Sequence, residues 1–321
     1  MTTYLLRRVA FLLVSLLLAS ASLFVLLRLL PGDPANALVS VGATPEQIVA
    51  AQTQIGSNRP VPEQFVTWVG QMARFDLGKS FISSLPVAEE IGARLVVTLP
   101  LTLISFVVAV GIAVPLGYVA ARHSARWYGV ALSAISQLGI AVPVFWVGIL
   151  LIGGFALRWH VLPAGGFPAD DWADPVAALR SLALPIATIA IVMSSSLIRY
   201  VRSATLDVLG SDYLRTARAL GATFDGAMLR HGLRNASVPV ISILGIELAT
   251  TFLGAVVVEA VFALPGLGSM LLRAIEQKDY PNIQGILLVS TIGVLVIGFL
   301  ADLVQRLVDP RLRDSLSGNR S

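Results

Sequence analysis

Six long runs of apolar residues, separated by more polar segments, dominate the pattern of the chain. They cover approximately residues 9–27, 96–120, 130–157, 182–198, 240–262 and 286–303. An α-helix rises about 1.5 Å per residue, so about 20 apolar residues cross a hydrocarbon layer of about 30 Å. Backbone polar groups inside a bilayer must be hydrogen-bonded within the segment, which a helix achieves. The pattern therefore predicts an all-α polytopic membrane protein with six transmembrane helices.

The first apolar run has two interpretations. A cleaved signal peptide has an apolar region of about 7–15 residues that ends at a small-residue cleavage site. The run 9–27 is longer, and Arg7 and Arg8 precede it. We therefore expect an uncleaved first span within residues 1–30, with the N-terminus inside the cell.

The polar segment 31–94 is predicted to be a small folded region outside the membrane, and its acidic residues outnumber its basic ones. Thr44, with Pro45 directly behind it and Gln47 three positions on, predicts the start of a short helix. A threonine side chain accepts hydrogen bonds from first-turn N–H groups, and proline is tolerated at the first helical position.

Gly78-Lys79-Ser80 in the same segment superficially matches the end of a nucleotide-binding P-loop. A P-loop requires a glycine five positions before Gly78, where this chain has Ala73. The segment also lies on the predicted outer face. We therefore expect ATP chemistry to belong to another chain.

The basic residues indicate the orientation of the spans. They gather at the N-terminus, between the second and third runs, between the fourth and fifth runs, and after the sixth run. In a six-span protein these four segments lie on one side, and basic loops are typically cytoplasmic. We expect a multi-pass membrane protein with both termini cytoplasmic. The net charge of +4 is explained by these flanks, so no nucleic-acid partner is expected.

Composition excludes several other classes. Charged residues make up 13% of the chain, against about 25% in soluble domains. There is no cysteine, which excludes disulfides and thiolate metal sites. His123, His160 and His231 lie far apart in the sequence, so no metal site is predicted. No HExxH, GxSxG or clustered Ser, His and Asp set is present, and we predict no catalytic residues.

The most polar long segment between two strongly apolar runs is residues 212–239. Its apolar residues recur at roughly helical spacing on both sides of Gly221. Glycine costs about 1 kcal/mol relative to alanine inside a helix, so a turn at Gly221 is expected. The stretch predicts two short amphipathic helices, suited to docking on a soluble partner. A solvated cytoplasmic loop is the alternative.

This stretch resembles the EAA loop of ABC-importer permeases, the loop whose first helix couples to the ATPase. Only Ala217 and Gly221 match the Glu-Ala-Ala-x-x-x-Gly pattern, since Arg215 and Thr216 replace its first two residues. The departures, with RTARALG and LRHGLRN, resemble the oligopeptide/dipeptide/nickel class. LPGDP from Leu30, FDLGKS from Phe75, VVVEAVFALPGLG and VDPRLR resemble the same class. The chain is similar to its B-type permease subunits.

The resemblance implies a MetI-like permease fold with an extracytoplasmic region at 31–94. It implies a core at 95–310 that contains a cytoplasmic coupling loop at 203–239, and a cytoplasmic tail at 311–321. The implied partners are a second homologous permease, two ATP-binding subunits or domains, an external substrate-binding protein and the lipid bilayer. ATP and Mg would be bound by the ATPases, and no cofactor is expected in this chain. Peptides are the implied substrates, with nickel chelates, glutathione and haem as alternatives.

Candidate site residues fall into two groups. The coupling group implied by the resemblance is Asp212, Leu214, Arg215, Ala217, Arg218, Leu220 and Gly221, with the arginines offering polar contacts and the apolar residues packing. The candidates for the translocation path or gate are Glu247, Thr250, Thr251, Glu259, Pro265 and Gly266.

Glu247 and Glu259 stand out because a carboxylate at mid-membrane costs about 2.5–3.5 kcal/mol on insertion scales. Glu247 is expected to face the path or a subunit interface, although a purely structural role is open. Glu259 is either a gate residue or an interfacial residue that reaches water. Pro143 marks either a kink near the path or a packing bend.

Two rival classes stay open on the sequence. A secondary transporter would work without an ATPase, but it would be expected to show paired broken helices or an internal repeat. A membrane scaffold or enzyme would not need a coupling hairpin.

Overall fold

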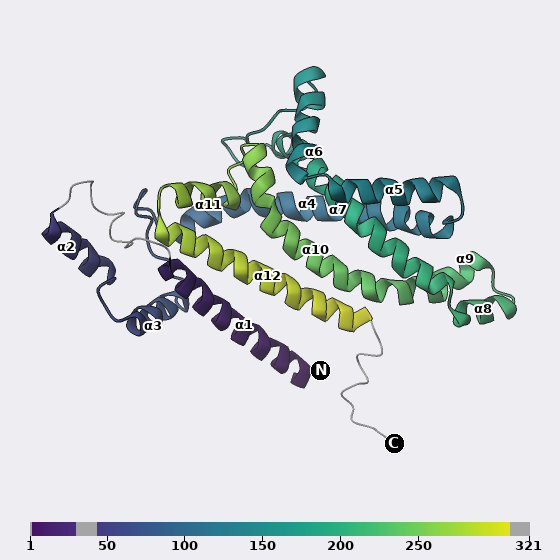
Figure 1. Ribbon diagram of the computed structural model, residues 1–321, viewed down its shortest axis with the longest axis horizontal. Coiled ribbons are helices and arrows are strands. Elements are labelled where there is room, and N and C mark those ends of the chain that lie inside the picture. Colours follow the sequence, from purple (N-terminus) through teal and green to yellow (C-terminus); the bar gives the residue numbers. More distant parts are fainter. Residues whose placement is uncertain (1, 30–43, 309–321) are drawn as a thin grey trace. The chain divides into compact units, whose positions relative to one another are not determined.

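The computed structural model describes residues 2–29 and 44–308 (Figure 1). Within these ranges the chain is built from helices joined by turns and loops. The predictions for LPGDPA at 30–35 and for the tail after Val308 fall outside the described residues. The chain divides into two compact units, one formed by residues 1–98 with 265–295 and the other by 99–264 with 296–321.

The first unit contains most of the predicted outer region. Its helices are α1 (Thr2–Leu29), α2 (Pro45–Ile55), α3 (Val61–Met72), the start of α4 (Val87–Arg122), α11 (Leu267–Glu276) and the start of α12 (Tyr280–Val308). The predicted cap of α2 is confirmed: the N–H of Gln47 donates to Thr44 Oγ1 at 3.4 Å, and the N–H of Thr44 donates to Gln47 Oε1 at 3.0 Å. This reciprocal pairing satisfies two donors that the helix start leaves without partners.

Aromatic side chains connect α1 to α3. The ring of Phe24 lies 5.3 Å from that of Phe65 and 5.6 Å from that of Trp68, measured between centroids. Aromatic pairs at this spacing contribute about 0.5–1.5 kcal/mol beyond the area they bury. The end of α1 is therefore held against α3.

The second unit is organised around α7 (Pro175–Leu209), which packs against α5 (Trp127–Ala141), α6 (Val144–Leu151) and α10 (Leu233–Val261). Figure 1 shows α7 beside α10 over much of its length. The remaining elements are the π-helical turn η2 (Ile152–Arg158), α8 (Asp212–Ala219), α9 (Phe224–Ala227) and the π-helical turn η3 (Met228–Gly232). The core between α4 and α7 is built from small and medium side chains such as Ala109, Ala113, Ala190 and Leu197.

Five of the predicted spans agree with single long helices, and the third is a bent pair of helices that breaks at the predicted Pro143. Among the described residues, five helices are long and apolar enough to cross a membrane. The run 130–157 is not one straight helix, because α5 and the α6–η2 helix meet at a bend of 101°. Val142 is extended there (φ −85°, ψ 125°) and Pro143 follows it. Proline has no N–H and disfavours the helical conformation of the residue before it, which explains the break.

The predicted coupling loop 203–239 includes the ends of both long helices. Helix α7 continues to Leu209, and α10 begins at Leu233 with Pro239 inside it. The expected bounds followed apolarity, whereas both helices extend beyond their apolar runs. The segment outside these two long helices is therefore limited to residues 210–232.

Candidate functional site

The predicted hairpin is present between α7 and α10. Helix α8 ends at Ala219, and Gly221 follows with φ +94°. This left-handed conformation strains residues that carry a Cβ, so glycine is favoured there. Thr223 then caps α9, accepting a hydrogen bond from the N–H of Gly226 at 3.2 Å. The break predicted at Gly221 is confirmed.

The inner face of the hairpin is fixed by apolar packing. Leu214 is 3% exposed and belongs to a buried cluster with Val208 of α7, Met228 of η3 and Ala236 of α10. Ala217 packs against this cluster and is partly buried. Burying a leucine side chain contributes about 1.5–3 kcal/mol. Leu214 and Ala217 therefore hold α8 on its own chain and are not free to pack on a partner as expected.

The outer face of the hairpin is polar, apart from one leucine. Leu220 is 84% exposed, since the helix ends before it and it leaves the periodicity of the inner face. Asp212, Arg215 and Arg218 are exposed as well. Arg215 Nη1 lies 3.5 Å from Asp212 Oδ1, in a solvent-exposed pair. The structure thus divides the predicted coupling residues into an internal pair and an exposed group.

Arg122, the last residue of α4, fastens the second half of the hairpin. Its Nη1 lies 2.8 Å from Asp225 Oδ1, and its guanidinium carbon lies 5.0 Å from the centre of the Phe224 ring. Arg218 lies 5.8 Å from the same ring on the other side of the turn. Solvent screens this exposed ion pair, so its contribution to stability is small. Arg122 was predicted only as part of a basic loop, and its role depends on packing that the sequence pattern does not contain.

A pocket of about 220 Å³ lies where α7 and α10 meet the break between α5 and α6. Glu247, Thr250 and Thr251 of α10 line it together with Met193 and Ser196 of α7. Ile140 and Val144, one on each side of the Pro143 break, complete the border. The structure therefore brings together three predicted path residues and places them at the predicted kink.

Glu247 is hydrogen-bonded in this pocket, where the hydroxyl of Ser196 donates to Glu247 Oε1 at 2.7 Å. Thr250 donates to the carbonyl oxygens of Ile246 and Glu247 on its own helix, which leaves its methyl group toward the surroundings. Thr251 Oγ1 lies 3.6 Å from the sulfur of Met193. A half-buried carboxylate among mostly apolar residues favours binding of a cationic or hydrogen-bond-donating group.

The other predicted gate residues are not part of this pocket. Glu259 is completely buried in the second unit, so the alternative that it reaches water does not agree with the structure. Pro265 and Gly266 belong to the first unit, where Gly266 directly precedes α11. Asp302 is half-buried near the end of α12.

A buried polar cluster in the first unit was missed by the sequence interpretation. Asp279 Oδ2 accepts hydrogen bonds from Ser80 Oγ at 2.5 Å and from Asn282 Nδ2 at 2.9 Å, and Asp279 Oδ1 accepts one from the N–H of Phe81 at 3.1 Å. Asn282 also donates to Glu90 Oε2 at 2.9 Å. Asp279 is 2% exposed. The cluster holds the turn after Gly78 against the start of α12.

Positive charge accompanies these carboxylates. Arg94 and Arg273 line the same cavity of about 130 Å³ as Glu90 and Asp279. Within the described residues, no group of three His, Cys, Asp or Glu side chains is arranged to hold a metal ion. The only available signal for the cluster was an acidic residue close before the last apolar run, and it did not identify Ser80 as the partner.

Comparisons with known proteins agree with the arrangement of helices and hairpin. Residues 113–314 match the family described as binding-protein-dependent transport system inner membrane component, and residues 1–102 match its N-terminal counterpart. A putative peptide transport system permease of Brucella abortus is 36% identical over 314 residues, which cover 98% of this chain and 99% of that protein. The glutathione transport system permease GsiC of Escherichia coli K12 is 34% identical over 313 residues, with 98% and 99% covered.

Solved structures support the fold. An inward-facing structure of the MetNI methionine ABC transporter aligns with a TM-score of 0.56 at 19% identity, covering 68% of this chain and 96% of that one. The expected MetI-like fold is confirmed by this likeness. The chain therefore belongs to the family of binding-protein-dependent transport system inner membrane components, and it is a membrane permease subunit of an ABC importer of the peptide/dipeptide/nickel class.

Proposed function

We propose that this permease pairs with a second, homologous permease to form the path for short peptides, which an external binding protein delivers and two cytoplasmic ATPases drive. Peptides are favoured because relatives that match nearly the whole chain carry peptide or glutathione transport names, and glutathione is itself a small peptide. In this proposal both termini and the α8–α9 hairpin are cytoplasmic, and the turns around α2 and α3 lie outside.

One observation carries the proposal: the same two helices anchor the hairpin and line the Glu247 pocket. Helix α7 contributes Val208 to the hairpin cluster and Ser196 to the pocket, while α10 contributes Ala236 and Glu247. Packed cores switch between discrete arrangements and do not deform continuously. A long helix in such a core therefore moves as one unit and carries a displacement from one end to the other. A displacement of the hairpin by an ATPase would therefore shift both walls of the pocket.

The exposed end of the hairpin has the composition of a docking surface. Leu220 projects from a turn flanked by Arg215 and Arg218, so an apolar anchor is surrounded by donors of charge-assisted hydrogen bonds. We assign the contact with the ATPase to these three residues. Leu214 and Ala217 act indirectly by fixing the angle of α8.

The pocket contributes a carboxylate to the path. Glu247 suits the ammonium group of a peptide or a backbone N–H, and the methyl groups and sulfur around it tolerate varied side chains. Coarse recognition of this kind leaves selection of the substrate to the external binding protein.

Cross-linking from single cysteines tests the docking assignment, because the natural chain contains no cysteine. We expect Leu220→Cys to cross-link to the co-expressed ATPase. The buried Leu214→Cys should not cross-link to it. A membrane-impermeant maleimide applied to intact cells should label Asn58→Cys and not Ala222→Cys. Equal cross-linking at positions 214 and 220 would contradict the proposed docking surface. Labelling of Ala222→Cys and not of Asn58→Cys would contradict the proposed orientation.

A further inference from the structure

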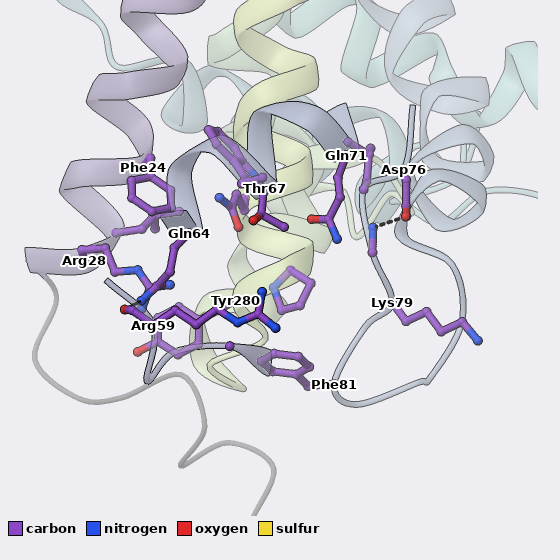
Figure 2. Close-up of a pocket in the computed structure, with 17 residues that line it drawn as sticks. Phe24, Arg28, Arg59, Gln64, Thr67, Gln71, Asp76, Lys79, Phe81 and Tyr280 are labelled. Atoms are coloured by element: carbon purple, nitrogen blue, oxygen red, sulfur yellow. Dashed lines mark hydrogen bonds between the residues drawn. The ribbon is translucent and has the colours of Figure 1, made fainter. Parts of the chain in front are cut away.

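A second pocket, of about 440 Å³, lies entirely in the first unit and is not used by the proposed transport path. Its volume falls within the roughly 300–1,000 Å³ typical of small-molecule sites. The lining comes from the end of α1, the turn between α2 and α3, the face of α3, the turn around Gly78 and the start of α12 (Figure 2). Five separate segments thus converge on one polar depression.

The charge of this pocket is predominantly positive. Among the described residues, its lining includes Arg28, Arg59 and Lys79 but a single carboxylate, Asp76. Asp76 Oδ1 already accepts a hydrogen bond from the N–H of Gly78 at 2.9 Å, which Figure 2 draws as a dashed line. The pocket therefore favours an anion.

Two guanidinium groups form the centre of this positive region. Figure 2 shows Arg28 and Arg59 on the same side of the pocket as Tyr280, whereas the Lys79 side chain extends away from them. Arg28 is held by Phe24, whose ring centre lies 5.5 Å from the guanidinium carbon. Guanidinium groups bind phosphate oxygens through two parallel N–H donors, and a neighbouring tyrosine hydroxyl adds a further donor.

The position of the pocket relative to the two spans identifies the occupant. Arg28 is the first charged residue after the uncharged run 9–27, and Tyr280 is the first residue of the other membrane helix at this pocket. The pocket therefore lies where α1 and α12 leave the hydrocarbon layer. Phospholipid phosphates lie at this level, and tyrosine and tryptophan side chains are enriched there. Trp68 lines the pocket as well.

We propose that this pocket binds the phosphate headgroup of an anionic phospholipid of the phosphatidylglycerol type. Arg28, Arg59 and the Tyr280 hydroxyl hold the phosphate, the side chain of Gln71 contacts the glycerol hydroxyls, and the acyl chains extend along α1. Placement in the outer leaflet depends on the proposed orientation, whereas binding itself does not. The lipid would join the first span to α3 and to the start of α12.

Native mass spectrometry of the detergent-solubilised full chain tests the proposal by titration with phosphatidylglycerol, phosphatidylcholine and inorganic phosphate. We expect preferential retention of phosphatidylglycerol. The Arg28→Gln/Arg59→Gln double variant should bind it about tenfold more weakly or worse, because two charge-assisted contacts are lost. Lys79→Gln and Arg74→Gln remove one charge each from the same region and should have little effect.

Separate controls test whether the double variant folds and whether positive charge accounts for binding. Monodisperse elution and an unchanged thermal midpoint establish that the double variant folds, and Arg28→Lys/Arg59→Lys should recover part of the affinity. If inorganic phosphate competes for the pocket as effectively as phosphatidylglycerol does, the natural ligand is a soluble anion. This result would overturn the lipid assignment.

Two other results would also overturn it. One is equal loss of binding in the Lys79→Gln and Arg74→Gln controls, which would indicate general surface attraction. The other is unchanged lipid binding in the double variant together with weaker binding of an external binding protein, which would make the pocket a protein-docking site. None of these measurements uses ATP or transport, so failure here is distinguishable from failure of the proposed importer mechanism.

Discussion

Replacement of Asp279 is the perturbation whose effect the structure defines most completely. Its carboxylate accepts hydrogen bonds from Ser80 Oγ, the N–H of Phe81 and Asn282 Nδ2. Asp279→Leu leaves all three donors without this acceptor, and an unsatisfied buried donor costs about 1–3 kcal/mol. The Phe81 N–H is only part-buried and Asn282 keeps its bond to Glu90, which limits the loss. We expect a net cost of about 3 kcal/mol.

The lost free energy should appear first as opening of the turn that Asp279 holds. A change of about 1.4 kcal/mol corresponds to a factor of ten in an equilibrium constant, so 3 kcal/mol corresponds to about a hundredfold. Limited trypsin digestion reports this opening, because Lys79 lies in the turn beside Ser80. Cleavage after Lys79 should accelerate by about two orders of magnitude if opening is fast relative to cleavage. Asp279→Asn keeps one acceptor oxygen and should show a smaller increase.

The matched control is Glu89→Gln, which removes an exposed carboxylate from the first turn of α4 close to the same turn. Its cleavage rate should equal that of the natural chain. If Asp279→Leu and Glu89→Gln are cleaved at the same rate while both proteins are folded, the buried hydrogen bonds of Asp279 do not hold the turn, and the reasoning is refuted.

The remaining predictions concern coupling and the path. Gly221→Val should abolish ATP-driven uptake while membrane insertion is unchanged, because a β-branched residue is strained at φ +94°. Asparagine tolerates that conformation, so Gly221→Asn should retain most activity. Equal uptake by both variants would refute the role of the turn. Glu247→Gln should lower uptake of peptides with a free amino terminus more than uptake of N-acetylated peptides, with Ser196→Ala as a milder variant, and equal losses would argue against recognition of the ammonium group. Arg122→Gln should weaken hairpin anchoring slightly and make ATPase stimulation less sensitive to salt than in the natural chain, since the exposed ion pair with Asp225 that salt screens is gone; a difference between the two proteins that does not shrink as salt is raised would show that the ion pair is not responsible.

Local features of the fold followed from the sequence because each depends on a few neighbouring residues. The helix cap at Thr44, the turn at Gly221 and the break at Pro143 reflect backbone preferences that act within one helical turn. Features that depend on tertiary packing did not follow. Ser80 and Asp279 are 199 positions apart, and no periodicity connects them.

The coupling residues show the same division. Leu214, Ala217 and Leu220 were grouped by their spacing, but α8 ends at Ala219, so Leu220 no longer shares the face of the other two. Similarly, Pro143 indicates an interruption without its angle, since the bend of 101° is set by how α5 and α6 pack against α7. The Glu247 pocket required the crossing of α7 and α10, although the cost of an intramembrane carboxylate had already indicated Glu247 itself.

The central claim is that ATPase contact at the hairpin drives peptide movement through this permease. Uptake of a labelled short peptide into proteoliposomes that contain both permeases, the ATPases and the external binding protein tests it most directly, comparing the natural chain with Leu220→Glu. The account predicts uptake that requires ATP and the binding protein and is lost in Leu220→Glu, while the Glu247 pocket and membrane insertion are intact. Uptake that continues without ATP, or that Leu220→Glu leaves unchanged, would contradict it.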